Sequence, residues 1–266
     1  MAIEVMSRIE SKYIINTDTY FKLLKTIENY THPDEYNRNN KLYTISNIYY
    51  DTDDNYLIRT SIAKPRYKEK LRLRAYGIPD TDDNVFLEIK KKYNGMVNKR
   101  RTTFSLSDAY EFLETHIAPK NENGQITNEL LYLLEAYNPK PKVYIAYDRK
   151  AYFSEDNNVR ITFDTNIRTR RYNLKLEDGD FGDKLLDSDT YLMEIKNEKA
   201  FPLWLAQLLS ECKVYKTAFS KYGTEYTKFL KNGDEPKCLN QFSIQEQRKQ
   251  QQPSPSHGIL RLPQYV

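Results

Sequence analysis

The sequence predicts an α+β domain built around an antiparallel sheet. Eight segments alternate apolar and polar residues with the period of a strand, and five segments have the spacing of an amphipathic helix. The two kinds of segment are interspersed without the regular rhythm of a parallel, doubly wound sheet. Asn94 and Gly95 lie between two of the strands and indicate a tight hairpin, because both residue types tolerate positive φ angles.

The strands are expected wherever charged or polar residues alternate with aliphatic or aromatic ones. They are predicted at about residues 5–15, 43–50, 66–76, 84–92, 96–104, 142–152, 158–164 and 190–197. The helices are expected wherever apolar residues recur every three or four positions. They are predicted at residues 18–30, 106–117, 128–137, 201–212 and 219–230.

A change of composition divides the chain in two. Residues 1–232 carry all of these elements, and 39% of the whole sequence is hydrophobic, which is enough for one ordinary core. We therefore expect a single folded domain there. Residues 233–266 are polar and rich in Gln, Pro and Ser, so we expect a disordered tail.

The composition also favours a soluble protein of a reducing compartment, which we expect to be the cytoplasm. The two cysteines, Cys212 and Cys238, supply neither a CxxC pair nor a disulfide framework. The first residues contain no signal-peptide core, and the longest apolar run, near residues 201–210, is too short to cross a bilayer.

Charged residues alternate along most of the predicted strands and therefore share one face within each strand. These sets are Arg8 with Glu10 and Lys12, Lys70 with Arg72 and Arg74, Glu88 with Lys90, Tyr147 with Arg149, Arg160 with Thr162 and Asp164, and Glu194 with Lys196. Two arrangements remain open, a sheet with one face in water and a closed barrel whose lumen carries the charges. The density of Arg favours a lumen that binds anions, since the guanidinium fork suits phosphate oxygens.

These faces combine the two kinds of group that phosphate chemistry needs. Lys and Arg bind phosphate chains, while carboxylates bind Mg²⁺ or Mn²⁺ through oxygen. Phosphoryl transfer requires little beyond such positioning and charge neutralisation. The formal net charge of +4 is too small to indicate a nucleic-acid-binding protein, and we expect no nucleic-acid partner.

Seven motifs, taken in order, resemble one known family. They are RIESKY, KLRLRAYG, FLEIKKKYNGMVNKRR, YIAYDRKAY, VRITFD, LMEIK and FSKY. Over about residues 7–230 they resemble the polyphosphate polymerase domain of the vacuolar transporter chaperone (VTC) family, within the triphosphate tunnel metalloenzymes or CYTH-like superfamily. The resemblance implies an eight-stranded antiparallel β-barrel tunnel with helices packed on the outside. It also implies transfer of the terminal phosphate of ATP to a growing polyphosphate chain, with release of ADP and with Mn²⁺ or Mg²⁺ as cofactor.

The resemblance assigns roles to individual residues. The phosphate ligands of the catalytic site would be Lys12, Arg72, Arg74, Lys90, Arg149 and Arg160. Glu194 matches the metal-binding glutamate of the family, and Glu10 and Glu88 would be further metal-binding carboxylates. Substrate contacts are expected from Arg59, Tyr147, Ser220, Lys221 and one of Arg100 and Arg101, which lie on opposite sides of their strand. Ser220 and Lys221 begin the last predicted helix, and a helix N-terminus suits an anion.

One motif departs from the wider superfamily. Hydrolytic and cyclase members commonly begin with Glu-x-Glu-x-Lys, whereas this chain has Arg8, Glu10 and Lys12. The cation at the first position favours a polymerase. Two alternatives remain open, an inorganic triphosphatase or polyphosphatase of the same fold and a non-catalytic module that binds polyphosphate or a nucleotide. The expected partners are ATP and polyphosphate, pyrophosphate or phosphate, and the eukaryotic family members suggest docking to a membrane protein.

Overall fold

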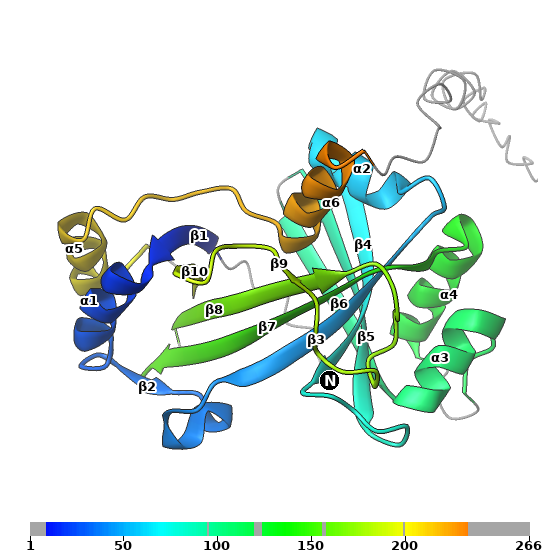
Figure 1. Ribbon diagram of the computed structural model, residues 1–266, viewed down its shortest axis with the longest axis horizontal. Helices are drawn as coiled ribbons and strands as arrows, with labels where there is room; N and C mark the ends of the chain where they lie inside the picture. Colours follow the sequence, from blue (N-terminus) through cyan, green and yellow to red (C-terminus); the bar gives the residue numbers. More distant parts are fainter. Residues whose placement is uncertain (1–8, 95, 120–123, 156–157, 199, 234–266) are drawn as a thin grey trace, which may run out of the picture.

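The computed structural model describes residues 9–94, 96–119, 124–155, 158–198 and 200–233 (Figure 1). Eight strands form the main path of a large sheet: β1 (Ile9–Asn16), β3 (Tyr43–Asp51), β4 (Tyr67–Tyr76), β5 (Asn84–Tyr93), β6 (Met96–Ser105), β7 (Lys140–Ser154), β8 (Val159–Arg170) and β10 (Thr190–Asn197). Their order is β1-β10-β8-β7-β3-β4-β5-β6, and every pair is antiparallel. Two short strands extend the sheet, since β2 (Thr31–Pro33) pairs with β7 and β9 (Asp183–Lys184) pairs with β8.

The described residues also form six α-helices and one 3-10 helix. They are α1 (Thr17–Ile27), η1 (Glu35–Asn40), α2 (Tyr56–Ala63), α3 (Leu106–Thr115), α4 (Gln125–Tyr137), α5 (Leu203–Glu211) and α6 (Lys221–Lys231). The predicted α+β class and the large antiparallel sheet are confirmed. The sequence did not predict η1, α2, β2 or β9. The predicted tail lies, apart from Gly233, outside the described residues.

The sheet is open, so the prediction of a closed barrel is wrong. Within the described residues no pairing joins the two edge strands, β1 and β6. The outer edge of β1 is instead occupied by the segment that precedes α6. Thr217 forms an isolated antiparallel bridge with Lys12, and its backbone N–H donates to the Lys12 carbonyl at 2.7 Å. At this point the outer edge of β1 is therefore not available for pairing with β6, which would close the sheet.

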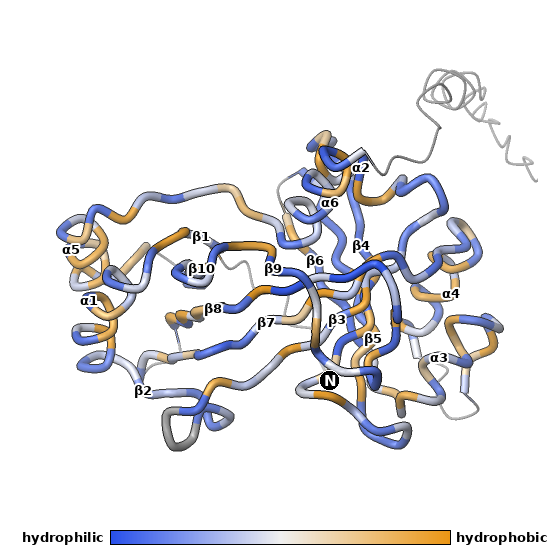
Figure 2. Tube along the Cα trace, viewed as in Figure 1, coloured by the Kyte–Doolittle hydropathy of each residue, from blue (hydrophilic) through white to orange (hydrophobic). Residues whose placement is uncertain are grey.

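The two faces of the sheet have different surroundings. We call the face that carries Lys12, Arg72, Glu88, Arg149 and Glu194 the charged face, and the other the outer face. On the outer face, α3 and α4 pack on the β3–β6 end, and α1 and α5 pack on the β1, β10 and β8 end. Figure 2 shows hydrophobic stretches of the strands at both ends, where these helices cover them.

Helix α6 packs on the charged face itself. Its Tyr222 and Tyr226 belong to one hydrophobic cluster with Tyr49 of β3 and Tyr147 of β7. Tyr49 is the register partner of Arg72, and paired residues in an antiparallel sheet point to the same side. The prediction that helices pack on the outside is therefore correct for α1, α3, α4 and α5 and wrong for α6.

Candidate functional site

Strands β4, β5 and β6 arrange basic residues in rows across the charged face. The register gives the rows Lys68–Lys92–Val97, Lys70–Lys90–Lys99 and Arg72–Glu88–Arg101. We call these three rows the cationic half of the face, because seven of the nine positions are Lys or Arg and one is a carboxylate. A fourth row, Arg74–Phe86–Thr103, is only partly charged.

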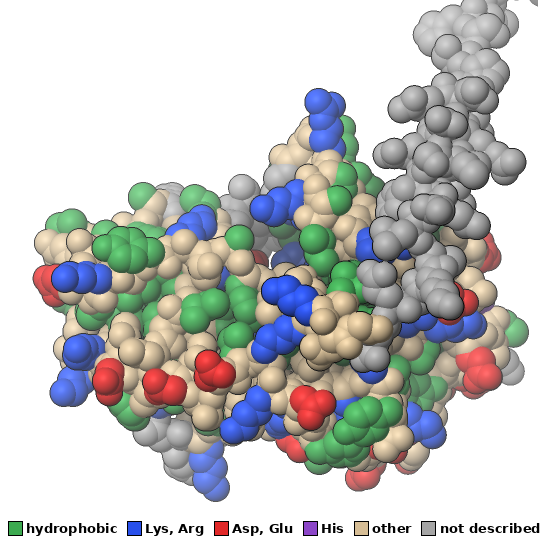
Figure 3. Space-filling view, turned by 45° about the horizontal axis from the view of Figure 1, so that its top comes forward, with side chains coloured by type: hydrophobic (Ala, Val, Ile, Leu, Met, Phe, Trp, Pro, Cys, Tyr) green, Lys and Arg blue, Asp and Glu red, His purple; other side chains and the backbone are tan. Residues whose placement is uncertain are grey.

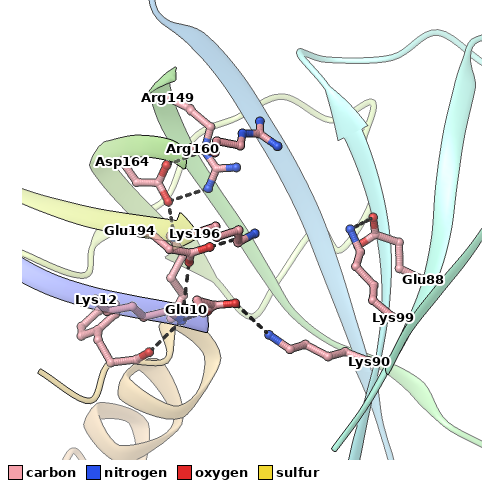
Figure 4. Close-up of polar contacts among 12 residues, drawn as sticks. Glu10, Lys12, Glu88, Lys90, Lys99, Arg149, Arg160, Asp164, Glu194 and Lys196 are labelled. Atoms are coloured by element: carbon pink, nitrogen blue, oxygen red, sulfur yellow. Dashed lines mark hydrogen bonds and ion pairs between the residues drawn. The ribbon is translucent and has the colours of Figure 1, made fainter. Parts of the chain in front are cut away.

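Strands β1, β10 and β8 form a second group, in which cations and carboxylates are balanced. The register gives the rows Glu10–Lys196–Arg160, Lys12–Glu194–Thr162 and Ile14–Leu192–Asp164. We call these rows the mixed half, since they hold three basic and three acidic residues. Lys90 links the two halves, as its Nζ lies 3.8 Å from Glu10 Oε2 (Figure 4). Figure 3 shows Lys and Arg side chains on both sides of an indentation in the middle of the molecule.

Lys12 lies at the centre of the mixed half. Its Nζ is 3.2 Å from Glu10 Oε1 and 3.7 Å from Glu194 Oε2, while Lys196 Nζ is 2.9 Å from Glu194 Oε1. Burial alone would raise the pKa of Glu194, but Lys196 and Lys12 outweigh it and hold the pKa well below its usual range. Glu194 is therefore an ionised carboxylate although only 12% of its side chain is exposed.

Glu88 is the carboxylate of the cationic half. It accepts a hydrogen bond from Arg72 Nε at 2.6 Å, and Lys99 Nζ lies 2.8 Å and Arg74 Nη1 3.7 Å from its other oxygen. Burial opposes ionisation, but these cations hold the pKa of Glu88 well below its usual range. Glu88 thus orients Arg72 and Lys99, and this environment favours a positioning role over the predicted binding of metal. Lys99 was not among the predicted site residues.

A second buried carboxylate organises the centre of the face. Asp164 of β8 has no exposed surface and accepts two hydrogen bonds from Arg149, at 2.6 and 2.9 Å, and one from Lys221 at 2.5 Å (Figure 4). Burial would raise the pKa of Asp164, but Arg149 and Lys221 lower it. The sequence placed Asp164 on the charged face without assigning it to the site, because its link to Lys221 spans 57 positions of the chain.

Tyr147 lies beneath these cations. Arg74 donates to its hydroxyl at 3.4 Å, and Lys221 Nζ lies 4.0 Å from the centre of its ring. Burial would raise the pKa of Tyr147, but Arg74, Arg149 and Lys221 lower it to about 8. A lowered pKa in a buried tyrosine reflects the positive charge of the three cations around the phenol.

The start of α6 connects the two halves. Ser220 caps the helix by accepting from the Gly223 N–H at 3.1 Å, and it also accepts from Lys70 Nζ at 3.1 Å. The Lys12 ammonium donates to the Phe219 carbonyl at 3.2 Å. The predicted substrate residues Ser220 and Lys221 therefore lie beside Lys12 of the mixed half and Lys70 of the cationic half.

Three predicted residues lie at the margin of this arrangement or away from it. Arg101 is the register partner of Glu88 and lies on the charged face, with its guanidinium 4.9 Å from the Phe86 ring centre. Arg100 lies on the outer face, where its Nη2 is 3.8 Å from Glu129 of α4. Arg59 lies in α2, off the sheet, and donates to the Asp54 carbonyl at 3.0 Å.

Arg160 lies at the rim of the mixed half. Its Nη2 is 3.6 Å from Asp34, and its guanidinium is 4.9 Å from the Phe153 ring centre. With 31% of its side chain exposed, it is more accessible than Arg149 at 13%. Of these two arginines, Arg160 is therefore the easier one for a ligand to reach from solvent.

The carboxylates suit a metal ion whose remaining ligands are phosphate oxygens. They suit less well a metal site built from protein groups alone. Among the described residues no group of three or more His, Cys, Asp and Glu side chains could hold a metal ion. Glu10 and Glu194, however, converge on the same ammonium group of Lys12. Thr162, the register partner of Glu194, is 3% exposed, and its hydroxyl has no hydrogen-bond partner in the described part of the chain. Mg²⁺ typically takes one or two carboxylates and completes its shell with phosphate oxygens and water.

A charged sheet face of this kind has the Lys and Arg groups that suit phosphate oxygens. Residues 7–230 match the VTC domain, and the chain belongs to that family. The fold is the CYTH-like triphosphate tunnel fold, here with an open sheet. No helix in the described residues has the length and apolar character to cross a membrane.

Two solved structures are similar to this chain at low identity, and the first of them shares its fold. A candidate adenylate cyclase from Bacillus halodurans has a TM-score of 0.50 and 16% identity, covering 81% of this chain and 96% of that chain. A candidate adenylyl cyclase from Hippeastrum, described as having a dominant triphosphatase activity, has a TM-score of 0.49 and 15% identity, covering 83% and 96%. No curated protein matches the sequence.

Proposed function

We propose that this protein is a polyphosphate polymerase, which transfers the terminal phosphate of ATP to a growing chain of inorganic polyphosphate and releases ADP. The observation that carries the proposal is the cationic half, whose rows Lys70–Lys90–Lys99 and Arg72–Glu88–Arg101 hold five Lys and Arg positions and one carboxylate. A polymerase must hold two polyanions in contact, the donor and the acceptor, and their repulsion has to be neutralised. A hydrolase needs only water as its second reactant.

The residues act chiefly by binding and by charge stabilisation. Arg72 and Arg149 are held by Glu88 and Asp164, so their remaining N–H groups are fixed in direction before a ligand arrives. Donors fixed in this way stabilise the charge that develops on phosphate oxygens and need no reorganisation during the reaction. Lys12, beside Glu194, and Lys221, beside Asp164, add positive charge to the same face.

A divalent cation, Mn²⁺ or Mg²⁺, belongs to the proposal. Glu194, with Glu10 and the hydroxyl of Thr162, would hold it, since these are the oxygen donors that converge in the mixed half. When bound, such an ion neutralises charge on the phosphate oxygens of the donor. Lys12, whose ammonium group contacts both carboxylates, would supply positive charge for the phosphate chain.

The test is to incubate the protein with ATP and Mn²⁺ and to measure ADP, free phosphate and acid-insoluble polyphosphate in parallel. We expect ADP together with polyphosphate, and little free phosphate. ADP in equal amount with free phosphate would overturn the polymerase and indicate a hydrolase of the same fold. Binding of triphosphate with no ADP at all would indicate a module that binds without turnover.

A further inference from the structure

The cationic half continues beyond the residues that we assign to phosphate transfer. Lys68 and Lys92 form the row nearest the β5–β6 turn, and they lie four residues along their strands from Arg72 and Glu88. At about 3.4 Å per residue this is a distance of about 14 Å. Lys64, which follows α2 directly, adds a third ammonium group at this end. We call Lys64, Lys68 and Lys92 the lysine end.

These charges have no counter-ions of their own. Within the described ranges, no carboxylate lies within ion-pair distance of Lys64, Lys68 or Lys92, and the Lys68 ammonium donates only to the Ser61 carbonyl, at 3.0 Å. Burial lowers the pKa of Lys68, and repulsion from Lys92 and Lys64 lowers it further, so the three groups are close enough to interact. By contrast, Lys91 of β5 points to the outer face and is neutralised by Glu129, at 3.1 Å. On β5, therefore, Lys91 of the outer face is paired, whereas Lys92 of the charged face has no ion pair within the described ranges.

The opposite end of the same strands has a different chemistry. Phe86 lies opposite Arg74, and beyond this row the face continues with the aromatic rings of Tyr36, Tyr43 and Tyr76, which contact one another. The rings of Tyr36 and Tyr76 are stacked with centroids 5.8 Å apart. Inorganic polyphosphate has no apolar surface that could pack on such rings, whereas ammonium groups provide both charge and hydrogen-bond donors for it.

We propose that the lysine end binds the part of a polyphosphate chain that extends beyond the transfer site, and so makes the protein select long chains over short ones. This inference rests on the proposed function, because it names the route of the product along the same face. A triphosphate fills only the rows around Arg72 and Lys90, so it does not reach the lysine end. A chain of tens of phosphates reaches both.

The experiment compares a double variant, Lys68→Gln with Lys92→Gln, with a control that loses the same charge elsewhere. Lys22→Gln with Lys25→Gln is the matched control, since both lysines are exposed on α1 at the other end of the sheet. Dissociation constants are measured by calorimetry for tripolyphosphate and for a polyphosphate of tens of units. For each chain length, the dissociation constant of the variant is divided by that of the wild type, which removes the statistical advantage of long chains.

We expect the lysine-end variant to bind the long polyphosphate at least tenfold more weakly, with tripolyphosphate binding within twofold of wild type. The slope of log K against log salt for the long chain should fall by about 1.5, since each lost phosphate contact removes roughly 0.7–0.9. The control should change neither value. Equal losses for both lengths, or no loss for either, would overturn the inference. Turnover of ATP is measured separately, so a protein that makes no polyphosphate but shows the length-dependent loss would refute the polymerase and not the lysine end.

Discussion

Lys70 provides a sharp test of the charged face, because its protonation changes within an accessible pH range. Its Nζ donates to Ser220 Oγ at 3.1 Å, and no carboxylate of the described residues lies within ion-pair distance. Burial, together with repulsion from Lys90, Lys12 and Lys68, outweighs the opposing effect of Tyr49 and lowers the pKa of Lys70 to about 8. An anion bound beside Lys70 would raise the pKa again, since it favours the charged form.

The expected magnitude follows from proton linkage. With a pKa of about 8, Lys70 is roughly nine-tenths charged at pH 7 and roughly one-tenth charged at pH 9. If the bound ligand keeps the ammonium charged throughout, triphosphate affinity should fall about tenfold between these pH values through this group alone. Lys70→Arg should lack this fall, because a guanidinium remains charged at both pH values.

The same shift makes a prediction about stability without ligand. The folded pKa lies below the unfolded value of 10.5, so the unfolded chain binds more protons between pH 8 and 10.5. The contribution of Lys70 to stability therefore increases as pH rises through this window, and it is unfavourable below pH 8. Lys70→Met should raise the free energy of unfolding at pH 7 while it weakens the binding of triphosphate.

Calorimetric titration with tripolyphosphate at pH 7, 8 and 9 measures these effects, in the presence of a chelator and at constant ionic strength. The ligand and Tyr147 also titrate in this range, but both are present in wild type and in Lys70→Arg, so the difference between the two curves isolates Lys70. Parallel curves for the two proteins would refute the assigned environment of Lys70. A destabilised Lys70→Met at pH 7 would refute it independently.

Three further substitutions separate metal binding, phosphate binding and stability. Glu194→Gln should remove most metal-dependent turnover and leave triphosphate binding equal or tighter, because it deletes a negative charge beside an anion; full activity across a metal titration would make Glu194 a salt-bridge partner only. Arg149→Ala should weaken triphosphate binding and turnover together by about 1.5–3 kcal/mol, measured at fixed ionic strength, and unchanged affinity would exclude Arg149 as a phosphate ligand. Asp164→Asn should lower the free energy of unfolding in urea by about 3–5 kcal/mol, because it breaks a buried ion pair, and a change under ~1 kcal/mol would contradict this.

Local patterns in the sequence were sufficient to predict the main strands, because their alternation is strong and each strand buries one face. They were not sufficient for α2, which is short and is stabilised from outside the helix. The carboxylate of Asp51, in β3, accepts from the backbone N–H groups of Leu57 at 2.8 Å and Ile58 at 2.9 Å. An N-terminal cap supplied by a strand leaves no signature at the residue before the helix.

Closure of the sheet is a long-range property, and the family resemblance predicted it wrongly for this chain. It depends on whether β1 meets β6 or another segment, and these strands lie at opposite ends of the pairing order. Strand patterns carry no information about which segment occupies an edge. The bridge between Lys12 and Thr217 joins residues far apart in the sequence, so only the folded chain shows it.

By contrast, the sequence alone was sufficient to predict which of Arg100 and Arg101 lies on the charged face. A two-residue turn at positions 94 and 95 fixes the register of the hairpin, because each step away from the turn pairs the next residue on both sides. Counting outward from Tyr93 and Met96 places Arg101 opposite Glu88, which is the pairing in the structure. The same count places Lys99 opposite Lys90, so both Arg101 and Lys99 could have been assigned to the charged face.

Net charge was a poor guide to the partner of this protein, and the structure explains why. A total of +4 over 266 residues suggests no strong preference for polyanions. On the outer face Lys91 is neutralised by Glu129, while Lys68, Lys70 and Lys92 on the charged face have no such partner in the described residues. The carboxylates of the charged face pair with other cations, such as Arg72 and Arg149, so Lys68, Lys70 and Lys92 keep an unpaired positive charge. The electrostatic field at that face depends on which cations lack a neighbouring carboxylate. The cross-strand register, and not the composition, determines which cations these are.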